Sequence, residues 1–145
     1  METSITANKN VVELLYTLIT RGETEEATRL MASDLEWWFH GPPRRQHMMM
    51  LLTGQSGALT GFRFEPQRVA EVGEWVVAEG EEEGAYWVHV WTVKDGVITQ
   101  FREYFNTWLT VREVGQVGPT KMDTLWQSEP RSYLGRSLPS LVLAV

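Results

Sequence analysis

The spacing of apolar residues divides the chain into a helical first part and a strand-rich remainder. In residues 5–20, apolar side chains recur every three or four positions, which predicts an amphipathic helix that Gly22 ends. A second, shorter helix is predicted over residues 23–31, because acidic residues open that stretch. A strand follows over residues 34–40, and a third short helix is predicted over 44–53.

After Gly61 the pattern changes to runs rich in β-branched and aromatic residues. These runs predict four antiparallel strands, at 62–72, 74–81, 86–93 and 97–114. The pair Asp95-Gly96 is a strong hairpin signal, and the acidic run 81–84 is a weaker one. Helices followed by antiparallel strands indicate an α+β fold. We expect one domain over residues 1–115 and an irregular tail over 116–145, whose apolar end packs on the domain or on a dimer partner.

Composition narrows the classes of function. The 145 residues carry 13 basic and 19 acidic side chains, a net charge of −6, which argues against a nucleic-acid-binding protein. The absence of cysteine excludes disulfide scaffolds and thiolate metal sites, and it suits a reducing compartment. No membrane span or signal peptide is visible, so we expect a cytoplasmic protein. The histidines have no metal-ligand spacing and no phosphate loop is present, so we expect neither a metal nor a cofactor.

Seven tryptophans require an aromatic core or an aromatic-lined cavity. Side chains alternate across a strand, so Trp87, His89 and Trp91 share one face of their strand. A histidine between two indoles is typical of a ligand-site wall, although a core histidine gives the same pattern. In the strand 97–114, burial alone does not choose between the face of Phe101 and Glu103 and the opposite face.

Several sequence segments resemble a known family over essentially the whole chain. They read WFHGPP at 38–43, LLTG at 51–54, WVHVWTVKDGVITQFREYFNT at 87–107, and LWQS and SLPSLVLAV in the tail. These segments resemble the plant wound-induced, senescence-associated proteins of the SnoaL-like, or nuclear transport factor 2-like, superfamily. The resemblance implies a cone-shaped α+β fold, in which N-terminal helices pack in a curved antiparallel sheet and a pocket is enclosed. It brings no reaction with it.

Enzymes of the same superfamily suggest which face is inward. In limonene-epoxide hydrolase-like proteins, the acid of an R-D-Y-F motif on the last hairpin is catalytic and faces the cavity. Here REYF at 102–105 matches that motif, which puts Glu103 at the catalytic position and Phe101 beside it. The preceding strand of those enzymes supplies an Arg and an Asp, where this chain has Glu79 and Glu81. The hydrolase triad is therefore incomplete.

Ketosteroid isomerase gives a second partial match. Its catalytic base falls on Phe39 here, which cannot take a proton, while Tyr16 approximately matches its tyrosine and His89 its protonated carboxyl. This chain therefore has neither the complete hydrolase site nor the complete isomerase site.

The candidate catalytic residues are therefore Glu103 and His89. Burial among aromatic rings disfavours a charged carboxyl, which suits Glu103 to act as a general acid or base, and His89 can share its proton or orient a ligand carbonyl. The alternatives are an ion-paired or solvated Glu103 and a structural His89. The candidate ligand-binding residues, for which ordinary packing or a solvated edge is the alternative, are Tyr16, Trp37, Phe39, Glu79, Trp87, Trp91 and Phe101.

Two function classes follow. In the first, the protein is a cofactor-free isomerase or cyclase that transfers protons on a small apolar plant metabolite; in the second, it binds or senses a hydrophobic ligand without turnover. A third possibility is an interaction module whose cone is filled by its own side chains. The opposite sheet face is too apolar to meet water, so a homodimer through the sheet is expected. That face carries Tyr86, Val88, Val90, Tyr104 and Trp108.

Overall fold

The computed structural model describes residues 7–41, 48, 52, 64–82, 85–114, 122–130 and 141–144. In these residues two helices and eight strands follow one another along the chain. They are α1 (Ala7–Thr20), α2 (Thr24–Thr28), β1 (Met31–His40), β2 (Arg68–Val72), β3 (Trp75–Glu82), β4 (Ala85–Lys94), β5 (Val97–Phe105), β6 (Leu109–Val114), β7 (Met122–Gln127) and β8 (Leu141–Ala144).

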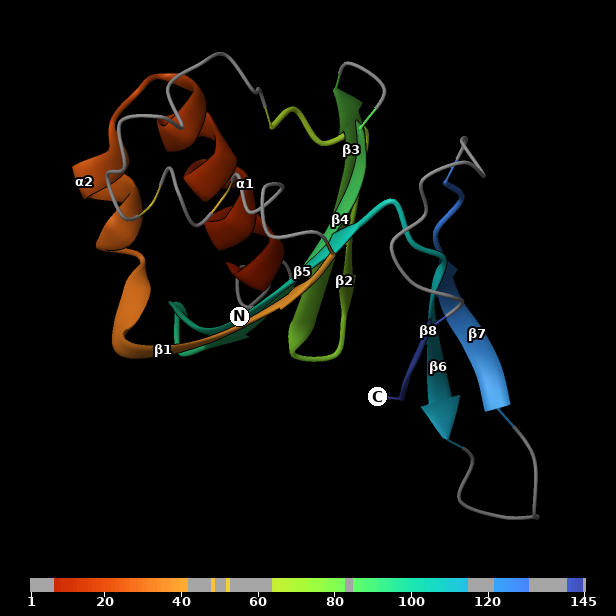
Figure 1. The fold of residues 1–145 in the computed structure, drawn as a ribbon. Helices are drawn as coiled ribbons and strands as arrows, with labels where there is room; N and C mark the ends of the chain where they lie inside the picture. Colours follow the sequence, from red (N-terminus) through yellow and green to blue (C-terminus); the bar gives the residue numbers. More distant parts are fainter. Residues whose placement is uncertain are drawn as a thin grey trace.

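The main sheet has the strand order β1-β5-β4-β3-β2 and curves around α1 (Figure 1). This arrangement confirms the α+β cone expected from the sequence. The prediction of a wholly antiparallel sheet is wrong, since β1 pairs with β5 in parallel. Parallel neighbours need a long crossover, and here more than fifty residues separate the two strands.

Local turn chemistry explains the antiparallel part of this sheet. Asp95 and Gly96 have φ angles of 53° and 77°, as a two-residue type I′ turn requires, and they join β4 to β5. The sequence prediction for this hairpin is confirmed. Gly73, with φ 62°, similarly joins β2 to β3.

Helix α1 packs its apolar stripe on the concave face of the sheet. Val12 and Leu15 are fully buried there, whereas Leu14 on the opposite side of the helix is 47% exposed. Burying large aliphatic side chains contributes about 1.5–3 kcal/mol each, so this face holds the helix on the sheet. We call the buried residues between α1 and the sheet the inner cluster: Val12, Leu15, Tyr16, Ala27, Met48, Phe64, Val76, Ala78, Trp87, Trp91, Val93, Ile98 and Phe101.

The long strand predicted over 97–114 is divided in two. Asn106 has φ 49°, a left-handed conformation that asparagine tolerates better than most residues, and its N–H donates to the carbonyl of Tyr86 at 2.6 Å. Strand β5 therefore ends in the main sheet, and β6 starts a second sheet of order β7-β6-β8. The tail, predicted to be irregular, supplies both β7 and β8.

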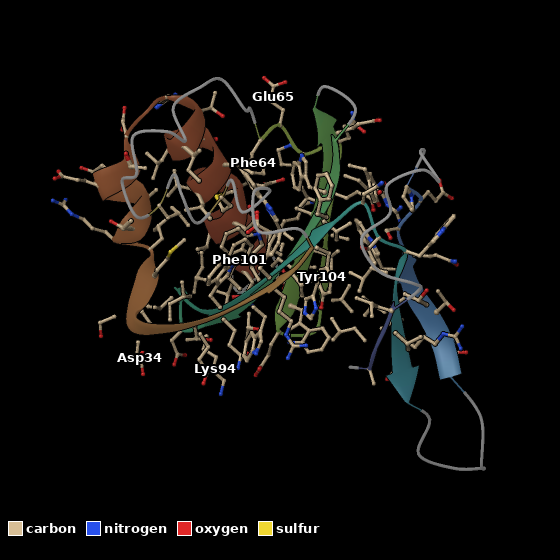
Figure 2. All side chains as sticks on the ribbon, viewed as in Figure 1. Asp34, Phe64, Glu65, Lys94, Phe101 and Tyr104 are labelled. Carbon is tan, nitrogen blue, oxygen red and sulfur yellow. The ribbon has the colours of Figure 1, made fainter. Side chains whose placement is uncertain are left out.

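The second sheet covers the outer face of the main sheet. In Figure 2, Phe101 points toward α1 and Tyr104 toward the C-terminal strands. The apolar outer face, over which the sequence predicts a dimer partner, is thus buried by the chain's own strands, and a homodimer stays a prediction. We call the buried residues between the sheets the outer cluster: Val77, Tyr86, Val88, Val90, Tyr104, Leu109, Val111 and Trp126.

Some predictions lie outside the described residues. Of the helix predicted over 44–53, only Met48 and Leu52 are described, and both are helical. Of the three consecutive methionines, Met48 is fully buried. Within the described ranges, no helix is long and apolar enough to cross a membrane, and no group of three or more His, Cys, Asp or Glu can hold a metal ion.

Candidate functional site

Three adjacent strands bring the predicted site residues together on the concave face. The registers of β1 with β5 and of β5 with β4 place their inward side chains in rows across the sheet. The rows are Trp37–Phe101–Trp91, then Phe39–Glu103–His89, then Phe105–Trp87. The middle row therefore carries the two polar residues, and aromatic residues flank it on both sides.

The next strand makes room for these large rings. On β3 the residues opposite Trp91, His89 and Trp87 are small, ending with Gly80. A Cβ atom at position 80 would lie 2.6 Å from the ring of Trp87, so only glycine fits beside this indole. The aromatic layer is thus specified by small residues on the neighbouring strand.

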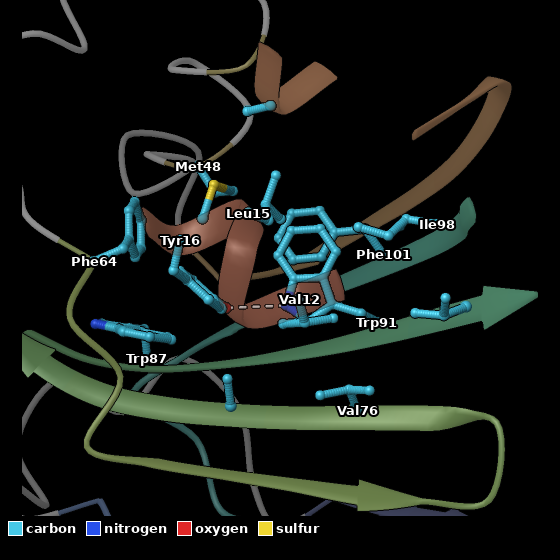
Figure 3. Close-up of a cluster of buried hydrophobic side chains, with 13 residues drawn as sticks. Val12, Leu15, Tyr16, Met48, Phe64, Val76, Trp87, Trp91, Ile98 and Phe101 are labelled. Carbon is cyan, nitrogen blue, oxygen red and sulfur yellow. Dashed lines mark hydrogen bonds between the residues drawn. The ribbon is translucent and has the colours of Figure 1, made fainter. Parts of the chain in front are cut away.

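A chain of hydrogen bonds leads from α1 to His89. The indole N–H of Trp91 donates to the Tyr16 hydroxyl oxygen at 3.0 Å, the contact that Figure 3 marks with a dashed line. Tyr16 Oη lies 2.7 Å from His89 Nδ1. The indole can only donate, so the phenol accepts from Trp91. Because the Glu103 carboxyl faces His89 Nε2, we assign the imidazole proton to Nε2 and let the phenol donate its hydrogen to Nδ1. His89 is therefore neutral, with its proton on Nε2.

Burial keeps both the His89 imidazole and the Tyr16 phenol uncharged. Burial lowers the pKa of His89, against an opposing effect of the nearby Glu103 carboxylate. Burial likewise raises the pKa of Tyr16 well above its usual value, the indole of Trp91 opposes this, and Glu103 adds to it. Both directions favour a neutral phenol bonded to a neutral imidazole.

Glu103 continues this chain on one carboxyl oxygen only. Its Oε2 lies 3.5 Å from His89 Nε2, an electrostatic contact longer than a good hydrogen bond, and it accepts the Met48 backbone N–H at 3.3 Å. Within the described part of the chain, its Oε1 is buried without a hydrogen-bond partner, as are His89 Nε2 and the indole N–H groups of Trp37 and Trp87. Buried polar atoms are nearly always paired, so these unpaired atoms need an explanation.

Aromatic rings surround His89 on several sides. The ring centroids of Trp87, Phe101 and Phe64 lie 4.4, 4.9 and 5.0 Å from that of the imidazole. Such a shell excludes water, which strengthens the electrostatic interaction between the imidazole and the carboxyl. The sequence does not predict Phe64 or Met48 as part of this group. Phe64 precedes Pro66 outside any strand, so strand parity does not apply to it.

A groove of about 450 Å³ lies beside this cluster, between α1 and the segment 64–69. Tyr16 and Phe64 belong both to the groove and to the aromatic shell of His89. The residues that line it are Glu13, Tyr16, Thr17, Thr20, Arg21, Phe64, Glu65, Pro66 and Val69.

Glu79 does not share the inner site with the other predicted residues; it lines a separate hollow of about 190 Å³ on the outer face, beside Arg68 and Tyr86. Ala78 pairs with His89 and faces α1, so the next side chain points to the outer face. There Glu79 Oε2 accepts the Tyr86 hydroxyl at 2.7 Å, and Oε1 lies 3.4 Å from the Arg68 guanidinium. Burial raises the pKa of Glu79, against these two partners. The other predicted residues, Trp37 and Phe39 included, share the inner face.

Comparison with known proteins identifies close relatives. The model of the family described as "Wound-induced protein WI12" matches residues 49–145. Senescence associated gene 20 of Arabidopsis thaliana is 37% identical over 110 residues, in an alignment that covers 68% of this chain and all of that protein. Wound-induced protein 1 of Solanum tuberosum is 41% identical over 105 residues, in an alignment that covers 67% of this chain and all of that protein.

Solved structures share the fold at lower sequence identity. TerC, co-crystallised with polyporic acid, has a TM-score of 0.54 at 22% identity over 68% of this chain and 91% of TerC. A Mycobacterium tuberculosis epoxide hydrolase of the limonene-epoxide hydrolase-like type has 0.54 at 21% identity, over 69% and 83% of the two chains. A Burkholderia pseudomallei nuclear transport factor 2-like protein of unknown function has 0.53 at 19%, over 68% and 90%. At these identities the likeness concerns the fold alone.

Proposed function

Because this chain belongs to the wound-induced protein WI12 family, whose fold here buries a Tyr16–His89–Glu103 chain, we propose that it binds a small apolar molecule and transfers protons on it. The reaction class is a cofactor-free isomerisation or cyclisation. Glu103 acts as the general base and acid, and His89 holds its carboxylate. The lack of cysteine suits this activity to the reducing cytoplasm.

The unpaired Oε1 of Glu103 is the observation that supports this proposal. Oε2 is occupied by the Met48 N–H and faces the proton on His89 Nε2, so Oε1 is the oxygen left to take a proton from a ligand. In an isomerisation, Oε1 accepts a proton from a carbon beside a carbonyl and returns it to another carbon of the same molecule. The imidazole N–H stabilises the carboxylate before the first proton transfer and after the second.

Several proteins of the same fold have names that indicate small-molecule chemistry. Among the structural neighbours are an epoxide hydrolase, a putative hydroxylase from Streptomyces galilaeus, and TerC, which was crystallised with polyporic acid. Because fold does not fix function, these neighbours support the proposal only as analogy. The residues of this chain have to carry the specific reaction.

The test compares two buried glutamates. The probe is cyclohex-3-en-1-one, whose isomerisation to the conjugated cyclohex-2-en-1-one moves one proton and increases ultraviolet absorbance. We expect the wild-type protein to accelerate this conversion and Glu103→Gln to lose about 10²–10⁴-fold of that acceleration. Glu79→Gln is the matched control, since Glu79 is also buried but faces the outer cluster. Equal rates for wild type and Glu103→Gln contradict the acid–base role.

Binding without turnover is the second candidate function. It is favoured by the burial of the polar pair, because His89 and Glu103 are 0% and 2% exposed and a substrate has to displace side chains to reach them. In this case the wild-type protein binds the probe without converting it. Protein-observed NMR separates the two functions, since chemical shifts then move with the probe while its own spectrum stays unchanged.

A further inference from the structure

The groove between α1 and the segment 64–69 has the size of a ligand site. Its volume of about 450 Å³ lies within the range of about 300–1,000 Å³ that is typical of small-molecule pockets. Tyr16, Thr17 and Thr20 follow one another at helical spacing along one side of α1, so they form one continuous wall. The groove therefore has a rigid helix on one side.

The floor and the far wall of the groove suit a flat apolar ring. The aromatic rings of Tyr16 and Phe64 line it, together with Pro66 and Val69. Tyr16 and Phe64 are themselves fixed, since both are nearly fully buried and pack on Trp87 with ring centroids 5.9 and 5.1 Å away. Only the edges of these two rings therefore reach the groove, and an edge-to-face contact with another planar ring is a favoured aromatic geometry.

The polar groups of the groove mostly accept hydrogen bonds. Among the described residues that line it, two carboxylates, Glu13 and Glu65, stand against one cation, Arg21. The Thr17 hydroxyl donates its hydrogen to the Glu13 backbone carbonyl at 3.0 Å, so only its lone pairs are left for a ligand. The lining thus carries a formal charge of −1, in a chain of net charge −6. Such a surface repels organic anions and favours uncharged hydrogen-bond donors.

We propose that this groove binds an uncharged hydroxylated aromatic compound, a phenol-type molecule whose ring lies on Pro66 and Val69 against the edges of Tyr16 and Phe64, and whose hydroxyl groups donate to the acidic rim. This inference rests on the proposed function in naming the site and class of the small-molecule ligand. It does not depend on turnover. The Tyr16 hydroxyl connects the occupied groove to His89 and Glu103.

The test uses three probes of the same shape: 1-naphthol, naphthalene and 1-naphthoate. Binding is followed by NMR of the protein's backbone amides and indole N–H groups. We expect 1-naphthol to shift the signals of Thr17, Thr20 and Val69, and naphthalene, which has no donor, and 1-naphthoate, which is an anion, to bind at least about tenfold more weakly. Equal affinity for naphthol and naphthoate overturns the assigned ligand class.

Two variants on the same helix decide whether the groove is the site. Thr17 is exposed in the groove, so Thr17→Trp fills it without disturbing the core; we expect it to abolish 1-naphthol binding. Leu14→Trp is the matched control, since Leu14 is exposed on α1 outside the groove. Unchanged binding to Thr17→Trp, or probe shifts confined to the Trp37 and Trp91 indoles, overturns the groove but leaves a small-molecule function intact. Loss of turnover in Glu103→Gln with unchanged naphthol binding supports both proposals separately.

Discussion

Glu103 and Glu79 are both buried glutamates of the main sheet, but they lie on opposite faces and have different partners. On the outer face, each carboxyl oxygen of Glu79 has a partner, Tyr86 on one and Arg68 on the other. On the inner face, Glu103 has its partners on Oε2, and Oε1 is buried and unpaired. The outer carboxyl therefore completes a structural contact, whereas the inner one keeps an unused acceptor.

The carboxyls of Glu79 and Glu103 also connect different parts of the molecule. The Tyr86 hydroxyl, which donates to Glu79, also accepts the Glu129 N–H at 3.0 Å, so this group joins β4 to the segment after β7. Arg68 also donates to the Gln127 carbonyl and lies 3.8 Å above the Trp126 ring. These contacts fasten the second sheet over the main one. The inner chain instead leads from Glu103 through His89 to a helix that borders an open groove.

The largest expected effect comes from removing one core side chain from each face of the main sheet. Phe101→Ala deletes a fully buried ring that stacks on Trp91 at 3.9 Å, and Leu109→Ala deletes a fully buried side chain of the outer cluster. We expect the free energy of unfolding to fall by about 3–5 and 2–5 kcal/mol, respectively, measured by urea denaturation. A loss below about 0.5 kcal/mol for Leu109→Ala contradicts packing of the second sheet on this face.

The next test compares two buried tyrosines, Tyr86 on the outer face and Tyr16 on the inner face. Tyr86→Phe leaves Glu79 Oε2 and the Glu129 N–H without this partner, and Tyr16→Phe does the same to His89 Nδ1 and the Trp91 indole. We expect each to lower stability by about 1–3 kcal/mol. Nitrogen-15 NMR of the histidines separates them. His89 is in the Nε2–H form in the wild type and Tyr86→Phe, and becomes a mixture of tautomers in Tyr16→Phe. An unchanged tautomer in Tyr16→Phe contradicts the assigned hydrogen-bond direction.

The dependence of stability on pH has opposite signs on the two faces. Burial lowers the pKa of His89, so the unfolded chain binds its proton first, and stability falls as pH drops below about 6.5. The slope approaches about 1.4 kcal/mol per pH unit at most. Burial raises the pKa of Glu79, so its contribution is present below its unfolded value and is lost as pH rises through its folded one.

Urea denaturation between pH 4 and pH 8 measures both effects. We expect His89→Gln to flatten the fall in the free energy of unfolding as pH drops below about 6.5. We expect Glu79→Gln to reduce the loss of free energy of unfolding as pH rises above about 4.5. If His89→Gln retains the full wild-type slope, another group is responsible and the buried neutral imidazole is wrong.

The smallest expected effect concerns the partly exposed ion pair between Arg68 and Glu79. Arg68 is about half exposed, so its ion pair with Glu79 is screened by water, and its ring contact adds little. We expect Arg68→Gln to cost about 0.5–1 kcal/mol. Arg29→Gln, which breaks an exposed ion pair with Glu26, serves as the control and is expected to cost less than about 0.5 kcal/mol. Equal costs for both variants indicate that Arg68 does not fasten the second sheet.

The sequence by itself determined the α+β class, because its signals are local, and the family resemblance added the cone shape. The apolar stripe of α1, the β-branched runs and the Asp95-Gly96 turn each depend on neighbouring residues only. Parity along a strand also predicted that Trp87, His89 and Trp91 share a face. The family resemblance then indicated that Glu103 lies on that face. The observed strand register, which places Glu103 opposite His89, agrees with this prediction.

Tertiary structure alone decided the remaining features. The break at Asn106 sends β6 to a second sheet, which strand parity through residues 97–114 cannot anticipate. The parity of β3 was ambiguous by sequence, and pairing of Ala78 with His89 turned Glu79 outward. The unpaired Oε1 of Glu103 and the groove beside Tyr16 depend on which distant segments meet. Local sequence sets the faces of an element, whereas long-range packing decides what each face meets, because those contacts join residues far apart in the chain.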